Sequence, residues 1–305
     1  MAQLSSDNLA NPNCPDCKGA GYTPRRPASD SDIPEMETCH CVRHQKMIFD
    51  RAQKLINANL PPVYARAEID SLHERTGTIS VEDKERGKMM DINESVIDKR
   101  NKQKIVDLIS APIPPGQVVI LTGPVGAGKT LGASIILRSQ IKRFGVTGFY
   151  ITVTDYVDAM RPNVVTVEEQ NRLRKLCREV GVLFLDDLGV EKGSPASMRA
   201  LWILINERNK NNLPTIITSN DKMSKIFGQT PEQQTLLTQA SEEVKETYFI
   251  GMRIYSRLKD RFVIEWPPTM GDWRDEDFKR KKAARSLAAS RGDRSDLHKL
   301  GEGEI

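Results

Sequence analysis

The sequence lacks the features that mark membrane-spanning and secreted proteins. No run approaches the ~20 apolar residues that a membrane span needs. The first residues, "MAQLSSDNLANPN", are polar, without the basic and then apolar regions of a signal peptide. Internal repeats are also absent from the 305 residues. We therefore expect a cytoplasmic protein with no membrane partner.

A strong charge of one sign is lacking as well. The formal net charge of +4 argues only weakly for an anionic partner such as nucleic acid. Basic residues gather instead between Phe278 and Arg294, where there are seven of them and one acidic residue. Residues 276–305 are therefore expected to form a solvated basic tail, and a dedicated DNA-binding arm is the alternative.

The N-terminal 43 residues lack the apolar side chains that a core needs, but they are rich in cysteine. Four of the five cysteines lie within the first 41 residues, and in a reducing compartment such a cluster suggests a metal ion. Four thiolates satisfy tetrahedral Zn²⁺ and leave no open position for catalysis. Zinc binding would also supply the missing stability. The predicted ligands are Cys14, Cys17, Cys39 and Cys41. Because C-x-C is less usual than C-x-x-C, His40 or His44 remains open as a replacement for one sulfur.

Two helices are predicted before the main domain. Residues 44–60 place apolar side chains at spacings that share one helical face, and "NLPPVY" then ends the pattern because proline cannot continue a helix. Residues 80–110 are highly charged with scattered apolar residues, as in a surface helix, and "APIPPGQ" ends them.

A regular alternation of strands and helices follows. The apolar, β-branched runs "VVILT", "GFYITV", "VLFLDD", "TIITSN" and "FVIEW" are mostly separated by helical patterns. This arrangement predicts an α/β fold with a parallel sheet flanked by helices. One helix carries a capping box of Thr166 and Glu169, and its apolar stripe includes Cys177, which we interpret as a buried packing residue rather than a reactive thiol.

The segment "GPVGAGKT" fits G-x-x-x-x-G-K-[ST] and lies between a strand and a helix, which is the context that this phosphate-binding motif requires. The glycines let backbone N–H groups close around phosphates, the lysine reaches the β and γ phosphates, and the threonine offers a hydroxyl to Mg²⁺. No N-K-x-D element for reading guanine follows, so ATP is favoured over GTP. The assigned loop residues are Gly123, Gly126, Ala127, Gly128, Lys129 and Thr130.

Two further strand ends present polar groups to this loop. "VLFLDDLG" ends a buried strand with Asp186, expected to hold Mg²⁺, and Asp187, expected to act as base or polariser for an attacking water. "TIITSN" ends in Asn220, whose amide is suited to orienting that water. Asparagine is also a common turn residue, so this alternative stays open.

Arginines occupy the end of the predicted ATPase. In "GMRIYSRLKDRF", Arg253, Arg257 and Arg261 follow helical spacing, and "GDWR" adds Arg274. Arginines at this spacing are usually surface charges. The site nevertheless lacks a cation for the γ-phosphate, and an arginine from a neighbouring subunit is a known solution.

In this order, "LFLDDLGVE", "TSN", "GMRIYSRL" and "GDWR" resemble the AAA+ ATPases over roughly residues 60–275. The resemblance is narrower to the helicase-loader branch, the DnaC and DnaI proteins, with the related IstB transposition ATPases. It implies that Asn220 is the first sensor, Arg274 the second sensor in cis, and Arg253 a finger acting in trans, with Arg257 as the alternative. The polar segment 221–249 is longer than this branch leads us to expect, and its role stays open.

The resemblance also implies an organisation and a function. DnaI and phage-type loaders look similar in having a small zinc module ahead of the ATPase, and in that family the N-terminal region docks on the replicative helicase. The expected divisions are a zinc-binding, partner-docking module (1–60), a linker and helical lead-in (61–115), an AAA+ ATPase domain (116–275) and the basic tail (276–305).

The leading hypothesis is an ATPase that forms a homo-oligomer with ATP and loads a hexameric replicative helicase onto single-stranded DNA, using ATP, Mg²⁺ and Zn²⁺. The first alternative is an IstB-like ATPase that selects target DNA for a transposase. The second is a zinc-containing adaptor that binds nucleotide without turnover.

Overall fold

The computed structural model describes residues 9–24, 35–83, 88–189, 195–227, 235, 237, 240–258 and 261–274. The chain falls into two compact units, Met1–Asn57 and Ala58–Ile305. The predicted basic tail, 276–305, lies outside the described residues, and so does most of the middle of the 221–249 segment. Among the helices that are described, none is long and apolar enough to cross a membrane.

The N-terminal unit consists of a small ribbon and one helix. Strands β1 (Tyr22–Pro24) and β2 (Met36–Thr38) pair antiparallel, and α1 spans His40–Ile56. The prediction of a helix over 44–60 is wrong at both ends. The helix begins directly after Cys39, which is its N-cap, and Asn57 ends it by donating its backbone N–H to the carbonyl of Gln53. Proline does not stop this helix, because Pro62 instead begins the next one, α2 (Pro62–Ala65).

Two antiparallel strands precede residue 94, so the prediction of a surface helix over 80–110 is wrong for its first half. Strands β3 (Thr78–Asp83) and β4 (Lys88–Asn93) pair antiparallel with Ile79 opposite Ile92. The sequence "TISV" alternates apolar and polar residues with the period of two that suits a strand. The helix α3 occupies Glu94–Ser110, and the side chain of Asn93 caps it by accepting a hydrogen bond from the backbone of Ser95.

Five of the described strands form one parallel sheet, which confirms the predicted α/β fold class. They are β5 (Val118–Thr122), β6 (Gly148–Thr152), β7 (Val182–Leu188), β8 (Thr215–Ser219) and β9 (Arg261–Glu265), in the order β6-β7-β8-β5-β9. All adjacent pairs are parallel, so the carboxyl ends of β5, β7 and β8 meet at one edge of the sheet.

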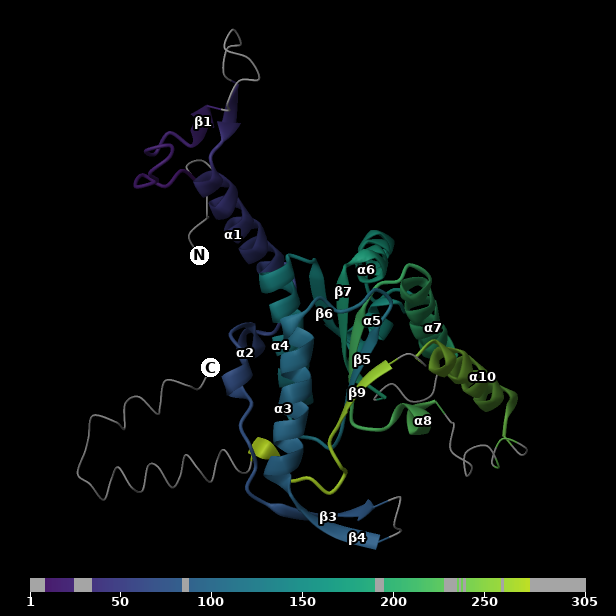
Figure 1. Ribbon diagram of the computed structural model, residues 1–305. Helices are drawn as coiled ribbons and strands as arrows, with labels where there is room; N and C mark the ends of the chain where they lie inside the picture. The colour runs from purple at the N-terminus through teal and green to yellow at the C-terminus, as the bar shows by residue number, and fades with distance from the viewer. Residues whose placement is uncertain are drawn as a thin grey trace, which may run out of the picture. The chain divides into compact units, whose positions relative to one another are not determined.

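Helices cover both faces of this sheet (Figure 1). One face carries α5 (Val153–Ala159), α6 (Val167–Glu179), α7 (Pro195–Lys210), the short α8 (Met223–Ile226) and α10 (Glu242–Arg257). The opposite face carries α4 (Lys129–Phe144). Along β5 the side chains alternate, so Val118 and Ile120 enter the core on the side of α5, α7 and α10, while Leu121 lies close to Gly132 of α4 on the other side.

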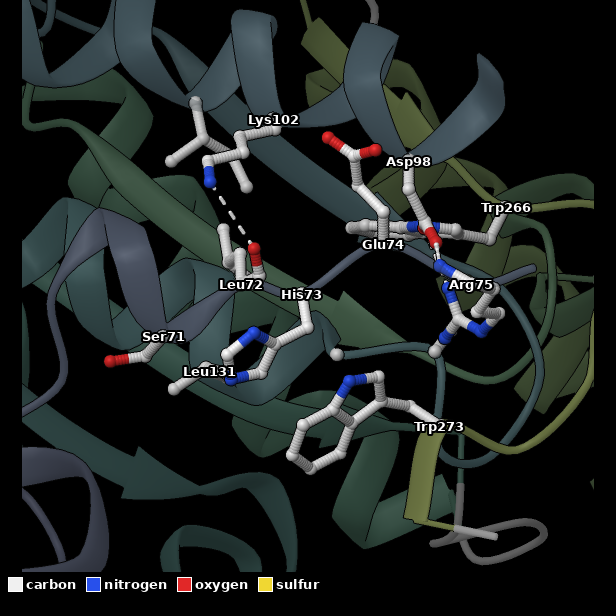
Figure 2. Close-up of a pocket in the computed structure, with 13 residues that line it drawn as sticks. Ser71, Leu72, His73, Glu74, Arg75, Asp98, Lys102, Leu131, Trp266 and Trp273 are labelled. Carbon is white, nitrogen blue, oxygen red and sulfur yellow. Dashed lines mark hydrogen bonds and ion pairs between the residues drawn. The ribbon is translucent and has the colours of Figure 1, made fainter. Parts of the chain in front are cut away.

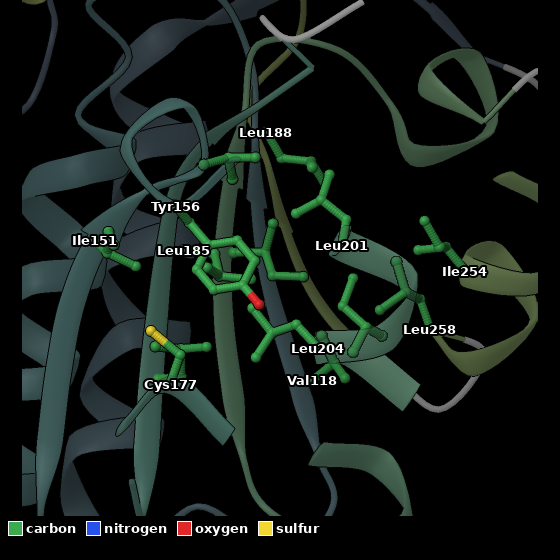
Figure 3. Packing of buried hydrophobic residues seen from close by; sticks show 14 of the residues in the cluster. Val118, Ile151, Tyr156, Cys177, Leu185, Leu188, Leu201, Leu204, Ile254 and Leu258 are labelled. Atoms are coloured by element: carbon green, nitrogen blue, oxygen red, sulfur yellow. The ribbon is translucent and has the colours of Figure 1, made fainter. Parts of the chain in front are cut away.

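The structure confirms two predicted details of the helix α6. Thr166 and Glu169 form the predicted capping box. Cys177 is fully buried in the cluster that Figure 3 shows, near Tyr156. Burial raises the pKa of the Cys177 thiol to about 12, so it stays protonated and acts as a packing residue.

Candidate functional site

A cleft of about 580 Å³ opens at the carboxyl ends of the central strands. It lies where the loop from β5 to α4 faces the ends of β7 and β8, which is where ligands bind in open α/β sheets. The structure thus brings together predicted residues from four separate parts of the chain. Those that line the cleft are Gly126, Gly128, Lys129, Thr130, Asp186, Asp187, Asn220 and Arg274. Tyr64 and Tyr150 also line it, and no sequence motif predicts either residue.

The loop has the backbone conformation that its glycines predict. Gly126 and Gly128 have φ of 72° and 90°, in the left-handed region, and Gly128 is the N-cap of α4. A side chain at Gly126 would also strike the carboxylate of Asp272. The first backbone N–H groups of α4 and its positive dipole end therefore face the cleft, which suits an anion.

Lys129 holds a nearly buried ammonium group above this loop. Its Nζ donates to the carbonyl oxygen of Pro124 and to Oδ1 of Asn220, at 2.8 Å in both cases. Burial lowers the pKa of Lys129, and the charges of Asp187 and Asp186 oppose this shift. The structure therefore brings Lys129 and Asn220 together across 91 residues of sequence, as their predicted roles at one phosphate require.

Asp186 is a buried carboxylate that hydroxyl groups orient. Thr130 Oγ1 donates to its Oδ1 at 3.0 Å, Tyr150 OH donates to its Oδ2 at 3.0 Å, and the hydroxyl of Thr218 donates to Oδ1 as well. Burial raises the pKa of Asp186, and these hydrogen bonds lower it. Tyr150 and Thr218 sit inside apolar strands, so only the pairing of β6 with β7 and of β7 with β8 shows that they reach this carboxylate.

Asp187 turns the opposite way from its neighbour. Its φ is 61°, and the register between β7 and β8 shifts between Leu185 and Leu188. Its backbone N–H donates to Thr218 Oγ1 at 2.9 Å, and its side chain is exposed. The left-handed conformation costs on the order of 1 kcal/mol outside glycine, although aspartate tolerates it better than most residues. This local irregularity turns two consecutive carboxylates in different directions, so that both line the cleft but Asp186 is buried and Asp187 is exposed.

The segment 266–274 closes the site from the C-terminal side. The backbone N–H of Trp273 donates to the carbonyl of Gly126 at 3.0 Å, and Arg274 lines the cleft while pairing with Asp272 at 3.1 Å. The ring of Trp273 is parallel to that of His73, with 5.8 Å between ring centres. Beside these rings is a small cavity of about 20 Å³, which borders the same loop through Ala127 and Gly128 (Figure 2).

The two predicted finger arginines do not line the cleft of their own chain. Both are exposed on α10. Arg257 is engaged locally, because its Nε donates to Asn206 Oδ1 at 3.3 Å and its guanidinium lies 5.6 Å from the ring centre of Trp202. The guanidinium of Arg253, by contrast, makes no hydrogen bond or ion pair to any residue that the structure describes.

The four N-terminal cysteines converge on one point, and all four are free thiols rather than disulfide partners. Their sulfur atoms lie within 4.8 Å of one another, with 3.7 Å between Cys14 and Cys39 and 3.5 Å between Cys17 and Cys41. A tetrahedral ion with Zn–S bonds of about 2.3 Å has sulfur–sulfur edges of about 3.8 Å. All four side chains are buried, although few apolar groups surround them. The donor set and its size therefore fit a zinc ion.

The histidine alternatives are less well placed. His40 lies near Cys14 and Cys39, but its Nδ1 is 2.9 Å from Oδ2 of Asp16 and both side chains are exposed. His44 lies outside the groups of potential ligands in the described part of the chain. Four cysteines complete a tetrahedral set without either histidine.

A family profile and several solved structures resemble this chain. The profile described as IstB-like ATP binding protein matches residues 84–240. The match to a crystal structure of DnaI has 21% sequence identity and a TM-score of 0.47, and it covers 68% of this chain and 94% of the DnaI chain. The DnaC helicase loader is 19% identical (67% and 99% covered, TM-score 0.46), and AMPPCP-bound DnaA from Aquifex aeolicus is 18% identical (68% and 51%, TM-score 0.41). No curated protein matches. Because these TM-scores lie below 0.5, the family assignment depends on the profile.

Proposed function

The chain belongs to the family of IstB-like ATP binding proteins, whose profile matches slightly more than half of its length, and from this premise we propose that it is an ATP-dependent helicase loader. In this proposal it delivers a hexameric replicative helicase onto single-stranded DNA in the cytoplasm. The observation that carries the proposal over the alternatives is the four-cysteine cluster in a separate N-terminal unit, ahead of the ATP-binding domain.

ATP would bind in the cleft with its phosphates over the loop. Lys129 would hold the β and γ phosphates. Thr130 and Asp186, which share a hydrogen bond, would hold Mg²⁺, and the ion would supply charge neutralisation for phosphoryl transfer. Asp187 and Asn220 would orient a water, whose oxygen bonds to the γ-phosphorus as the bond to the β-phosphate oxygen breaks. The products are ADP and phosphate, and Asp187 is the first acceptor for the water's proton.

Arg274 would contact the same nucleotide. Its present partner, Asp272, is only 30% exposed and lies against Gly126. Because phosphate carries more negative charge than one carboxylate, a bound triphosphate would draw the guanidinium away from this pair. Arg274 is therefore proposed as the second sensor in cis.

Arg253, rather than Arg257, is proposed as the finger that a neighbouring copy supplies. Its guanidinium has no partner among the described residues, whereas Arg257 is held by Asn206 and Trp202. The same helix exposes Phe249 and Met252, at 58% and 41%, and exposed apolar side chains beside a charged group are typical of an interface. We therefore expect a homo-oligomer that forms with ATP and loosens after hydrolysis.

Residues 1–60 would dock on the helicase. Zinc held by the four cysteines would fix the fold of this module, and α1 exposes Met47 and Ile48 as an apolar contact surface. Basic and aromatic groups of the assembled oligomer would contact single-stranded DNA.

The docking proposal is tested with the purified replicative helicase of the same genome. With ATP, the helicase should retain the wild-type chain and the Cys177→Ser variant, whose cysteine lies in the other unit. It should release Cys14→Ser/Cys17→Ser. Failure of the helicase to bind the wild-type chain would sink the loader proposal.

Turnover is tested by mixing variants. Lys129→Ala and Arg253→Ala should each abolish ATP hydrolysis, and a mixture of the two should recover part of it if the arginine acts in trans. Arg257→Ala is the matched control and should keep activity. Wild-type protein that binds ATP but never hydrolyses it would instead favour an adaptor.

The second candidate function is an ATPase that selects target DNA for a transposase. The match to the IstB-like profile favours it specifically. It predicts that a purified partner transposase, and no helicase, is retained by the ATP-bound protein.

A further inference from the structure

A buried arginine, Arg75, joins the phosphate loop to the segment that carries Arg274. Its side chain is only 2% exposed. Its Nη2 donates to the carbonyl oxygen of Gly126 in the loop, and its Nε donates to the carbonyl oxygen of Gly271, both at 3.0 Å. One planar guanidinium thus holds two backbone segments that are 145 residues apart in the sequence, 271 minus 126.

Asp98 on α3 holds this guanidinium in place. Its Oδ1 accepts from Arg75 Nη1 at 2.6 Å and from Trp266 Nε1 at 3.1 Å, and its Oδ2 accepts from the backbone N–H of Arg75 at 2.9 Å. Figure 2 shows Arg75 and Asp98 facing each other beside Trp266. On the same helix, Glu94 Oε1 accepts from the backbone N–H of Gly271 at 2.8 Å. The helix α3 therefore anchors both the arginine and the segment 266–274.

The contacts of Arg75 constrain the loop directly. The carbonyl of Gly126 accepts two hydrogen bonds, one from Arg75 and one from the backbone N–H of Trp273. Because a trans peptide unit is planar, fixing this carbonyl also fixes the N–H of Ala127, which points toward the carbonyl of Pro124. The peptide between Gly126 and Ala127 is thereby prevented from flipping inside the phosphate loop.

A stabilising role alone does not account for this arrangement. Burying an ion pair carries a desolvation cost, so apolar side chains of similar volume commonly stabilise a fold as well or better. Apolar side chains do not hold two carbonyl groups at a fixed separation, however. The distinctive property of Arg75 is this geometric link between the two sides of the cleft.

We propose that Arg75 is a positioning residue for nucleotide binding, which sets the phosphate loop and Arg274 in one fixed relation so that a triphosphate contacts both. The inference rests on the proposed ATP site and is independent of the helicase partner. Arg75 acts through Gly126 and Gly271 and does not itself line the cleft.

The test is a double-substitution cycle on ATP affinity. Arg75→Lys keeps the positive charge but loses the planar fork, so it cannot hold both carbonyls. Arg75→Lys should raise the Kd for ATP about tenfold, and Arg274→Ala about tenfold in the wild-type background. In the Arg75→Lys background, Arg274→Ala should raise the Kd for ATP less than about threefold, because Arg274 is already misplaced.

Arg208 provides a matched control. It is 1% exposed and donates to the carbonyls of Cys177, Val180 and Pro214, but it lies on α7 and does not line the cleft. Arg208→Lys should lower the Tm without nucleotide and leave the Kd for ATP unchanged. Should Arg75→Lys not fold, Asp98→Asn carries the test, since it keeps the side-chain volume and one acceptor and should raise the Kd in the same direction.

The outcomes separate this inference from the proposed function. Two results would overturn the inference alone. One is wild-type affinity for ATP in folded Arg75→Lys or Asp98→Asn. The other is a double variant whose Kd rises by the product of the increases caused by Arg75→Lys and Arg274→Ala. Wild-type protein that binds ATP no better than Lys129→Ala would overturn the ATP site, and the inference with it.

Discussion

Replacing Tyr150 by phenylalanine should weaken Mg²⁺-dependent ATP binding without disturbing the sheet. The substitution removes one hydroxyl from β6, and that hydroxyl donates to Asp186 Oδ2 at 3.0 Å. The ring stays in its edge contact with Phe184, whose centre is 5.1 Å away. The change is therefore confined to one donor of the carboxylate that is proposed to face the metal ion.

The expected magnitude follows from the charge of that carboxylate. A hydrogen bond to a charged group contributes about 1.5–3 kcal/mol. Asp186 keeps its donors Thr130 and Thr218, so the lower end applies. About 1.5 kcal/mol corresponds to roughly a tenfold rise in Kd. This rise should appear in Mg²⁺ and largely vanish in excess EDTA, because without the ion the orientation of Asp186 no longer matters to ATP.

Titration of a fluorescent ATP analogue, with Mg²⁺ and with EDTA, measures both affinities. Tyr156→Phe is the control, since Tyr156 is a buried tyrosine of the core that does not line the cleft. An equal loss in EDTA, an equal loss in Tyr156→Phe, or unchanged affinity of Tyr150→Phe in Mg²⁺ would refute the reasoning.

Three further predictions concern stability and the cysteines. Asp186→Asn should abolish Mg²⁺-dependent ATP binding yet leave the apo protein at least as stable at neutral pH. Burial raises the folded pKa of Asp186 above its ordinary value near 3.8, so the wild type takes up a proton on folding in that window. Its free energy of unfolding should fall relative to Asp186→Asn as pH rises from about 4 through the raised pKa, which urea titrations at several pH values would show. The purified chain should contain one zinc ion by elemental analysis. A strong chelator should unfold the N-terminal unit, which limited proteolysis would detect, and should leave ATP binding intact. Cys177, with its pKa raised to about 12 by burial, should resist a thiol reagent at pH 8 until the protein is denatured, and mass mapping that finds it modified in the folded protein would contradict its packing role.

The sequence was sufficient for features that local patterns determine. The runs "VVILT" and "VLFLDD" became neighbours of the same β8, and Asp186 and Lys129 met at one edge because parallel strands end together. The four cysteines converge, as their residue type and their spacing in the sequence predict. Each of these predictions depended on a short motif and on a general rule of sheet geometry.

Features that depend on long-range packing escaped sequence reasoning. The sequence predicts a helix from residue 80 onward, where the structure has the paired strands β3 and β4, because the charged residues of these strands also suit a solvated helical face. Arg75 resembles any surface arginine in sequence, and only its neighbours Asp98 and Gly271 show that it is buried. Tyr150 reaches Asp186 across a strand pairing, which no local pattern specifies.

The position of β9 has a consequence for synthesis on the ribosome. The strand that leads into the phosphate loop, β5, has β9 as one of its two neighbours, with Val118 opposite Arg261. The contacts of Gly126 with Trp273 come still later in the chain. A nascent chain that has emerged only as far as β8 therefore holds the complete phosphate motif on an unfinished sheet edge. Competence to bind nucleotide should arise abruptly, when the residues near 274 leave the exit tunnel.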